Sequence, residues 1–352
     1  MLAFPSASVI GSPAADGFSK AKGTYQGLFY EQGGVAAASA GYINAKTTET
    51  GTYSAKVSLA GRTYVVAGKF NAQGLATNTV ARPGASSVKV ELQLDLSGGD
   101  QLVGRVTDGN WSSQLLANRM VYSKAGQASP QAGSYTFLVA GDPAHSSTAP
   151  GGCGFATLKV DANGIVTFTG TLADGTKVTQ SSAVSKQGYW PLFVSLSGGR
   201  GVVVSWIQFV AQAEGDLGGS LIWSRAATAA KYYPEGFTNT ISATGAIYHA
   251  PAAGSRVLNL TQGNVVLSGG GLSQPVTNSV TLGLNNKVTS SSGKNLTLTI
   301  TTASGLFKGT AVNPANGKVT AIQGALSRKA NVGVGYFLGD TTSGEVRLGG
   351  AQ

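Results

Sequence analysis

The sequence predicts an all-β protein made of three tandem antiparallel β units, and three observations support this. Apolar and polar residues alternate along most of the chain, as in Val88–Leu96, which is typical of strands with one buried face. Turn residues recur roughly every 8 to 12 residues. Similar motifs also return at nearly constant spacing, which indicates an internal repeat of about 105 residues.

The expected strands are rich in β-branched residues and are separated by short turns. Thr63–Phe70 and Leu296–Thr302 alternate with Val, Ile and Thr at many positions. Asp161–Gly164 and Asn313–Gly317 contain Asn and Gly, which tolerate the positive φ of tight hairpins. No helical period is sustained, and the best helix candidate, Ser113–Arg119, fits a strand as well.

The repeat is defined by several anchors along the chain. Segments that start with glycine and carry a nearby tyrosine begin at Gly23, Gly133 and Gly245, which are 110 and 112 residues apart. Further anchors are glycine-led strands at Gly51, Gly164 and Gly263, the motifs Leu96-Ser-Gly-Gly99 and Leu196-Ser-Gly-Gly199, and a closing arginine at Arg119, Arg225 and Arg328.

These anchors predict an N-terminal tail over residues 1–18, a first repeat over 19–126, a second over 127–229, and a third over 230–352 that ends in a closing C-terminal hairpin. Each unit is expected to form a small barrel or a two-sheet sandwich. The scarcity of charge favours barrels, because sandwiches leave edges that charge or proline must protect. One large outer-membrane barrel fits less well, since the strands are short and no aromatic girdles bracket them.

Composition points to the outside of the cell. Only 11% of the 352 residues are charged, against a usual value of about 25%, and 51 are glycine. With so few charges the surface must be covered by Ser, Thr, Asn, Gln and Gly, which suits secreted and cell-surface β proteins. We therefore predict an extracellular or cell-surface location.

The net charge of +10 is spread over single Lys and Arg residues, so nucleic acid is not specifically indicated as a partner. A basic patch assembled by folding would attract a polysaccharide or another anionic surface polymer. The densest basic spots are Lys20-Ala-Lys22 and Arg328-Lys329. The oligomeric state is left open.

The longest apolar run, Gly201–Ala211, is too short to span a membrane as a helix, and no transmembrane segment is predicted. The first residues lack the basic start of a signal peptide, so we expect the native start to lie upstream, in a larger secreted protein. The single cysteine, Cys153, excludes a disulfide within the chain.

Five segments carry a resemblance to a known type of sequence: Pro150–Gly164, Thr171–Lys177, Gln187–Leu196, Gly305–Gly309 and Gly335–Gly339. Together they resemble the uncharacterised glycine-rich β-repeat regions near the C-termini of large secreted or cell-surface proteins of environmental bacteria. The resemblance covers most of residues 20–350. It implies a repetitive extracellular β module, with no catalytic residue or cofactor to carry over.

One loop holds most of the candidate catalytic residues. Asp142, His145 and Ser146, with Cys153, could supply an orienting carboxylate, a base and a nucleophile, or in part a metal site. However, triads normally draw their members from separate rigid elements, so we predict bystander side chains and no metal. The other histidine, His249, follows a strand and is expected to be structural or exposed.

A glycosidase would need only two carboxylates. The candidates are Asp95, Asp100, Asp108, Glu214 and Asp216, and we interpret the last two as turn residues. No EF-hand or phosphate-binding loop occurs, and no cofactor is predicted.

Aromatic residues offer a different kind of site. Core packing accounts for most of them. Trp190 and the pair Tyr232-Tyr233 are the candidates for a platform that stacks on sugar rings.

We therefore predict a non-enzymatic extracellular module with a structural, adhesive or display role. The first alternative is a carbohydrate-binding module, which requires Trp190, Tyr232 or Tyr233 to be exposed. The second is a hydrolase with a site between repeats, which requires His145 or His249 to be buried in a pocket beside a carboxylate.

Overall fold

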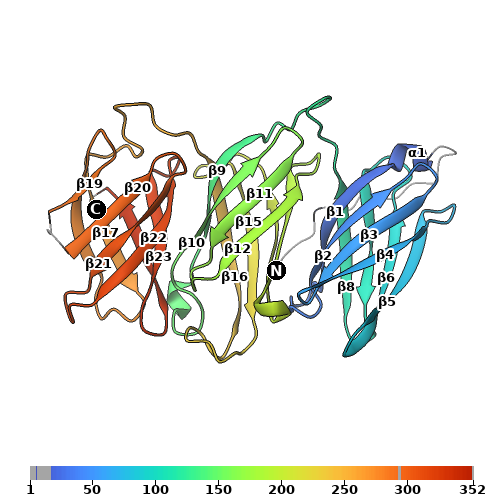
Figure 1. Ribbon diagram of the computed structural model, residues 1–352, viewed down its shortest axis with the longest axis horizontal. Helices are drawn as coiled ribbons and strands as arrows, with labels where there is room; N and C mark the ends of the chain where they lie inside the picture. The colour runs from blue at the N-terminus through green and yellow to red at the C-terminus, as the bar shows by residue number, and fades with distance from the viewer. Residues whose placement is uncertain (1–4, 6–16, 292–294, 351–352) are drawn as a thin grey trace.

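The computed structural model describes residue 5, residues 17–291 and residues 295–350 (Figure 1). These residues form three antiparallel sheets of eight strands each, in tandem. Each sheet is rolled into a nearly closed barrel of about 105 residues. The prediction of an all-β fold with three barrel-like repeats is confirmed. Figure 1 shows the barrels side by side along the long axis of the molecule.

The first barrel follows a short helix, α1 (Gly17–Ala21). Its strands are β1 (Gly23–Tyr30), β2 (Gly41–Thr47), β3 (Thr52–Leu59), β4 (Arg62–Lys69), β5 (Leu75–Arg82), β6 (Ala85–Leu94), β7 (Gln101–Thr107) and β8 (Ser112–Arg119). The second barrel contains β9 (Gly133–Val139), β10 (Gly154–Val160), β11 (Ile165–Thr171), β12 (Lys177–Ala183), β13 (Tyr189–Leu196), β14 (Gly201–Gln208), β15 (Leu217–Arg225) and β16 (Phe237–Ile247). The third contains β17 (Gln262–Gly269), β18 (Val276–Leu282), β19 (Val288–Ser290), β20 (Leu296–Thr301), β21 (Leu306–Val312), β22 (Val319–Ser327), β23 (Val332–Leu338) and β24 (Ser343–Gly349).

Each barrel closes by pairing its first strand with its last. Leu28 on β1 lies opposite Leu116 on β8, and β9 pairs with β16 and β17 with β24 in the same way. All other pairs join neighbours along the chain, with one gap in each barrel: β4 does not pair with β5, β12 does not pair with β13, and β19 does not pair with β20. This seam is why the barrels are nearly, and not fully, closed.

Polar side chains bridge two of the seams in place of a backbone ladder. In the first barrel, Asn78 on β5 donates through Nδ2 to the carbonyl oxygen of Ala67 on β4 (3.1 Å). In the second, Gln180 on β12 donates through Nε2 to the carbonyl oxygen of Pro191 on β13 (2.8 Å). Proline has no N–H to give to a ladder, so it suits a strand at an edge.

Each barrel encloses its own apolar core, which alternating strands fill. On β3 the buried residues are Tyr53, Ala55, Val57 and Leu59, with more exposed residues between them. The second core is the most aromatic, with Trp190 and Trp223 among its largest fully buried side chains.

A further apolar layer joins the first barrel to the second. Leu28 and Tyr30 on β1 pack with Phe193, Val204 and Trp206 on β13 and β14. Strand β14 is therefore buried on both faces, continuously from Gly201 to Ile207. Inward side chains fill the second core, whereas outward ones contact the first barrel. This double burial explains the longest apolar run of the sequence.

A second apolar layer joins the second barrel to the third. Phe155 on β10 lies against Tyr336 on β23, with ring centroids 6.1 Å apart. Cys153 packs against Val332 and Val334. Hydrogen bonds cross both boundaries: Thr136 Oγ1 donates to the carbonyl of Leu326 (2.7 Å), and the amide of Ala183 donates to Gln26 Oε1 (2.7 Å).

The predicted boundary between residues 229 and 230 is wrong, because β16 belongs to the second barrel. The motif Leu96–Gly99 follows the sixth strand of its barrel, whereas Leu196–Gly199 follows the fifth strand of the next. Arg225 likewise ends the seventh strand, while Arg119 ends the eighth. One more strand, β16, is needed to complete the second barrel.

The third repeat is offset further. Gly245 lies in β16, Gly263 in the first strand β17, and Arg328 follows the sixth strand β22. The expected closing hairpin is therefore the last two strands, β23 and β24, which complete the barrel wall. The anchors of the first two repeats do match at their start: Tyr25 and Tyr135 each donate to the carbonyl oxygen four residues earlier, at 2.7 Å.

Two smaller expectations can also be compared with the structure. The helix candidate Ser113–Arg119 is a strand, β8. The predicted tail over residues 1–18 lies mostly outside the described residues. Among the described helices, none is long and apolar enough to cross a membrane.

The layer between the first two barrels can be tested by comparing two leucines. Leu28→Ala is expected to lower the free energy of unfolding by about 2 to 5 kcal/mol, because Leu28 is fully buried. Leu75→Ala, at a side chain that is 46% exposed, should stay within about 0.5 kcal/mol of the parent. Urea unfolding monitored by tryptophan fluorescence measures both. Equal, small effects would contradict the packed interface.

Candidate functional site

The candidate catalytic loop forms a short 3₁₀ helix over Pro143–His145, and its polar contacts are local. Asp142 caps the helix by accepting from the amide of His145 (3.2 Å), as acidic N-cap residues do. His145 Nδ1 lies 3.0 Å from Asp142 Oδ2, and Asn239 Nδ2 donates to the same oxygen (3.1 Å). The His145 side chain is 71% exposed.

The charge state of Asp142 agrees with a structural role. Partial burial by itself would raise the pKa of Asp142. Hydrogen bonds from His145 and Asn239 lower this pKa by more than burial raises it, so the pKa lies below the ordinary value. The carboxylate therefore stays ionised at neutral pH and holds the turn.

No nucleophile completes this pair in the part of the chain that the structure describes. Cys153 is buried, and its Sγ donates to the carbonyl of Gly154 (3.4 Å). Burial raises the pKa of Cys153 to about 12, so its reactive thiolate is scarce at neutral pH. No hydrogen bond joins Ser146 to His145 among the described residues. Over those residues, no group of three or more His, Cys, Asp and Glu could hold a metal ion.

The remaining catalytic candidates also have structural partners or are exposed. His249 is exposed, and its carbonyl accepts from Arg328 Nη1 (2.6 Å). Asp216 pairs with Lys329 (2.7 Å) and accepts from the amide of Ile247. Glu214 is exposed. Two of the other carboxylates form ion pairs, Asp100 with Arg119 and Asp108 with Arg82. The carboxylate of Asp95 accepts a hydrogen bond from the amide of Ser97.

Trp190 is not available to a ligand. Its side chain is fully buried, and its Nε1 donates to Ser182 Oγ (2.8 Å). Its ring packs against Phe137 and Phe168, with centroids 5.9 and 5.6 Å away. The prediction that Trp190 forms a sugar-stacking platform is wrong, because the tryptophan fills the second core.

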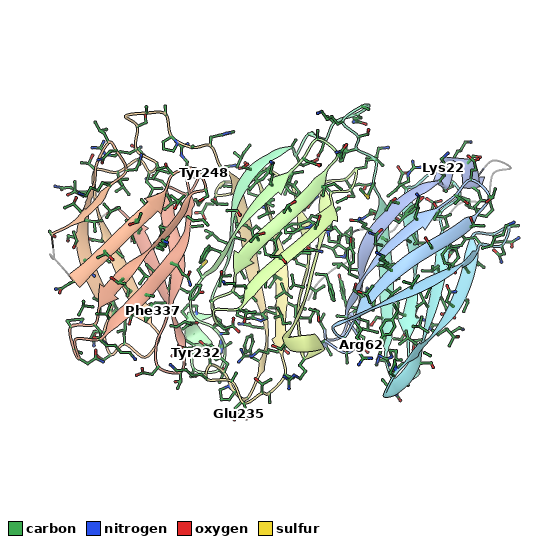
Figure 2. All side chains as sticks on the ribbon, in the orientation of Figure 1. Lys22, Arg62, Tyr232, Glu235, Tyr248 and Phe337 are labelled. Atoms are coloured by element: carbon green, nitrogen blue, oxygen red, sulfur yellow. The ribbon has the colours of Figure 1, made fainter. Side chains whose placement is uncertain are left out.

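The pair Tyr232-Tyr233 joins two barrels. Tyr233 is 3% exposed, and the amide of Ser343 on β24 donates to its Oη (2.8 Å). Tyr232, which Figure 2 labels, is half-buried and donates through Oη to the carbonyl of Gly339 in the third barrel (3.3 Å). Arg225 donates to both tyrosine carbonyls and pairs with Asp174 (2.9 Å).

The predicted aromatic platform thus has no exposed member. Across residues 17–291 and 295–350, no Phe, Tyr or Trp side chain is fully exposed, and the burial of Tyr233 contradicts its predicted ligand-binding role. The periodicity of the sequence could not reveal this, because the barrel contacts that bury these rings come from strands far apart in the chain.

A cavity of about 420 Å³ lies between the second and third barrels, and we call it the interface cavity. Thr244 and Leu138 line it from the second barrel, and Val334, Glu345 and Arg347 line it from the third. Burial raises the pKa of Glu345, and Arg347 only partly offsets this. Neither histidine lines the interface cavity, so the condition set for a hydrolase between repeats is not met.

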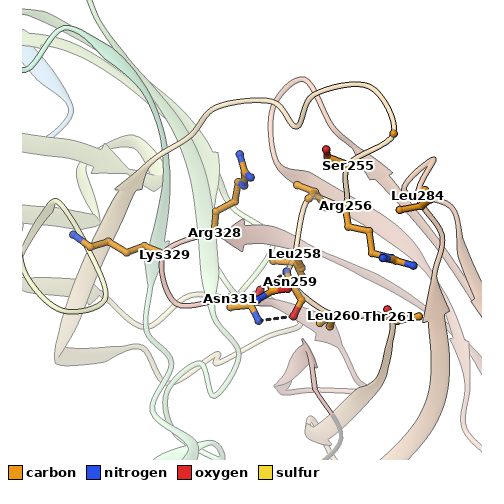
Figure 3. A pocket seen from close by; sticks show the side chains of 12 residues that line it. Ser255, Arg256, Leu258, Asn259, Leu260, Thr261, Leu284, Arg328, Lys329 and Asn331 are labelled. Carbon is orange, nitrogen blue, oxygen red and sulfur yellow. Dashed lines mark hydrogen bonds between the residues drawn. The ribbon is translucent and has the colours of Figure 1, made fainter.

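A second hollow, of about 850 Å³, lies on the third barrel beneath the linker of residues 250–261 (Figure 3). We call it the basic hollow. Three cationic residues line it, and no acidic residue is among its described lining. It is lined by Gly254, Ser255, Arg256, Val257, Leu258, Asn259, Leu260, Thr261, Leu284, Arg328, Lys329 and Asn331.

The three cations of the basic hollow differ in their partners. Arg256 donates through Nε to the carbonyl of Leu282 (2.7 Å), and Arg328 donates to the carbonyl of His249. Both arginines are therefore oriented by neutral groups, and their charge is not compensated by these contacts. Lys329 instead points toward the second barrel, where it pairs with Asp216 (Figure 3).

The linker itself is held in place by asparagines. The amide of Asn259 donates to Asn331 Oδ1 (2.6 Å), and Asn331 Nδ2 donates back to the carbonyl of Asn259 (3.2 Å). Asn286 Oδ1 accepts from the amide of Val257 (2.6 Å). Arg328 and Lys329 are neighbours in the sequence, but Arg256 is 72 residues from Arg328, so only the fold shows that they line one hollow.

No family model matches the chain, and no curated protein matches it significantly. Among solved structures, the chain is similar to transferrin-binding protein B of Haemophilus parasuis at 10% identity and a TM-score of 0.24, covering 93% of this chain and 75% of that one. Transferrin-binding protein B of Neisseria meningitidis is 12% identical with a TM-score of 0.21, and the match covers 93% of this chain and 76% of that one. A protein of unknown function from Nostoc punctiforme is 9% identical with a TM-score of 0.19, and the match covers 95% of this chain and 97% of that one. Similarity at this level does not establish a shared ligand.

The role of Trp190 can be separated from ligand binding. Trp190→Ala is expected to lower the free energy of unfolding by about 3 to 5 kcal/mol, because it empties a core site. Tyr232→Ala, at a half-buried position, should cost less. Chemical denaturation measures both. A stable Trp190→Ala protein that had lost affinity for a neutral glycan would restore the platform hypothesis.

The interface cavity makes a prediction about pH. A carboxyl group whose folded-state pKa is raised destabilises the fold once the pH rises above its unfolded-state pKa, because the buried charge is unfavourable. Glu345→Gln should therefore raise the thermal midpoint at neutral pH and have little effect near about pH 3. Glu235→Gln, at an exposed position, is the matched control. Equal shifts in the two variants at both pH values would contradict the burial of Glu345.

Proposed function

We propose that this chain is a non-enzymatic extracellular module of a larger secreted protein, in which three β barrels form a rod with a structural, adhesive or display role. The observation that carries the proposal is the burial of apolar side chains between successive barrels. Such layers fix the barrels relative to one another, whereas barrels on free linkers would move independently.

The middle barrel supports this interpretation because it is used on two walls. Strands β13 and β14 contact the first barrel, and β9 and β10 contact the third. A hydrogen bond that Gln26 accepts from Ala183 and one that Thr136 donates to Leu326 make these contacts directional. A rod of this kind holds its exposed loops at constant spacing.

The surface chemistry also supports a passive role. The few charged residues leave Ser, Thr, Asn and Gly to cover the outside, a composition typical of secreted β proteins. The His145–Asp142 pair holds a turn and has no nucleophile beside it among the described residues.

Small-angle X-ray scattering tests the rod directly. The parent protein is expected to give the scattering curve of one rigid, elongated particle that matches the structure. Val204→Asp places a charge in the buried layer between the first two barrels and should increase the radius of gyration, because an unpaired buried charge is costly.

Val65→Asp is the matched control, since Val65 is 71% exposed on β4 of the first barrel. It should leave the scattering curve unchanged. A parent protein that scatters as flexibly linked barrels would overturn the proposed rod.

A further inference from the structure

We propose that the basic hollow binds the carboxylate or sulfate groups of an acidic polysaccharide. The proposed extracellular role accounts for the source of this ligand. The binding site itself consists of residues of the third barrel and its linker. A failed binding measurement would therefore leave the proposed rod standing, and a flexible particle in the scattering experiment would leave the proposed binding site standing.

The two arginines are the anion-binding groups. A guanidinium has a planar set of donors that matches the two oxygens of a carboxylate or sulfate. Arg256 and Arg328 each donate from one guanidinium nitrogen to a backbone carbonyl oxygen. This hydrogen bond orients the side chain and leaves the other N–H groups for a ligand. No acidic side chain among the described lining residues competes for them.

The rest of the lining fits a sugar. The hydroxyl groups of Ser255 and Thr261 line the hollow on exposed residues, and the side chain of Leu284 is 56% exposed beside them. Hydroxyls can bind sugar hydroxyls, and an apolar side chain can cover the C–H face of a ring. A volume of about 850 Å³ lies within the range of pockets that enclose small organic ligands.

The hollow is already shaped in the absence of a ligand. Val257 and Leu258 are each 1% exposed, so they pin the linker to the third core. The reciprocal hydrogen bonds between Asn259 and Asn331, drawn as dashed lines in Figure 3, tie the linker to the segment that follows β22. A site that needs little reordering loses less conformational entropy on binding.

A polysaccharide fits better than a nucleic acid. Proteins that bind single-stranded nucleic acid combine a long basic groove with exposed aromatic rings for base stacking. No aromatic ring of the described residues is more than partly exposed, and both arginines line the same hollow. The spacing of single acidic groups along a glycan suits such a site.

The test uses the full chain and isothermal titration calorimetry at low and at physiological ionic strength. The probes are a carboxylated oligosaccharide (oligogalacturonate), a sulfated oligosaccharide (from heparin), neutral dextran, and single-stranded DNA of similar length. We expect one saturable site per chain for one or both acidic oligosaccharides, and no binding of dextran. Binding of one and not the other identifies the acidic group.

The decisive variant is Arg256→Gln with Arg328→Gln, which should weaken acidic oligosaccharide binding by about tenfold or more. Its control is Arg62→Gln with Lys69→Gln, which removes the same charge from exposed positions on β4 in the first barrel (Figure 2 labels Arg62). The control should retain the parent affinity, and circular dichroism checks that both variants fold.

Three results would overturn the proposal. Equal weakening in the two double variants would mean that only net charge is sensed. Equally tight binding of DNA would mean that the hollow does not select a sugar. No binding of either acidic oligosaccharide at low ionic strength would mean that the hollow is not an anion site.

Discussion

The structure depends on strands that are buried on both faces. A barrel strand usually alternates because one face contacts the core and the other contacts water. Strands β1 and β14 lose this alternation where the first two barrels meet, and β23 loses it against the second barrel. Their outward side chains form the apolar layers between barrels, which lie between the three separate cores.

Polar side chains connect parts of the structure that neither strand pairing nor the apolar layers join. Asn78 and Gln180 bridge seams between strands that do not pair. The buried Arg225–Asp174 pair holds the segment that carries Tyr233, and Tyr233 in turn contacts the third barrel. Removing one member of such a pair leaves an uncompensated buried charge, so this network specifies how the segment crosses between barrels.

The same geometry explains where chemistry can occur. Most aromatic rings of the described residues are buried in cores and interfaces, and many acidic side chains take part in turns and ion pairs. The hollow under the linker of residues 250–261 is open to solvent, and there Arg256 and Arg328 donate to backbone carbonyl oxygens.

Local sequence patterns determined the all-β class, the strand and turn rhythm and the tandem repeat, because alternation and turn chemistry act over a few residues. Tertiary structure alone decided that β16 closes the second barrel, since pairing a first strand with a last one depends on residues about 100 positions apart. It also decided that Trp190 and Tyr233 are buried and that Arg256 and Arg328 line the same hollow. Burial and charge clustering arise only when distant strands pack together.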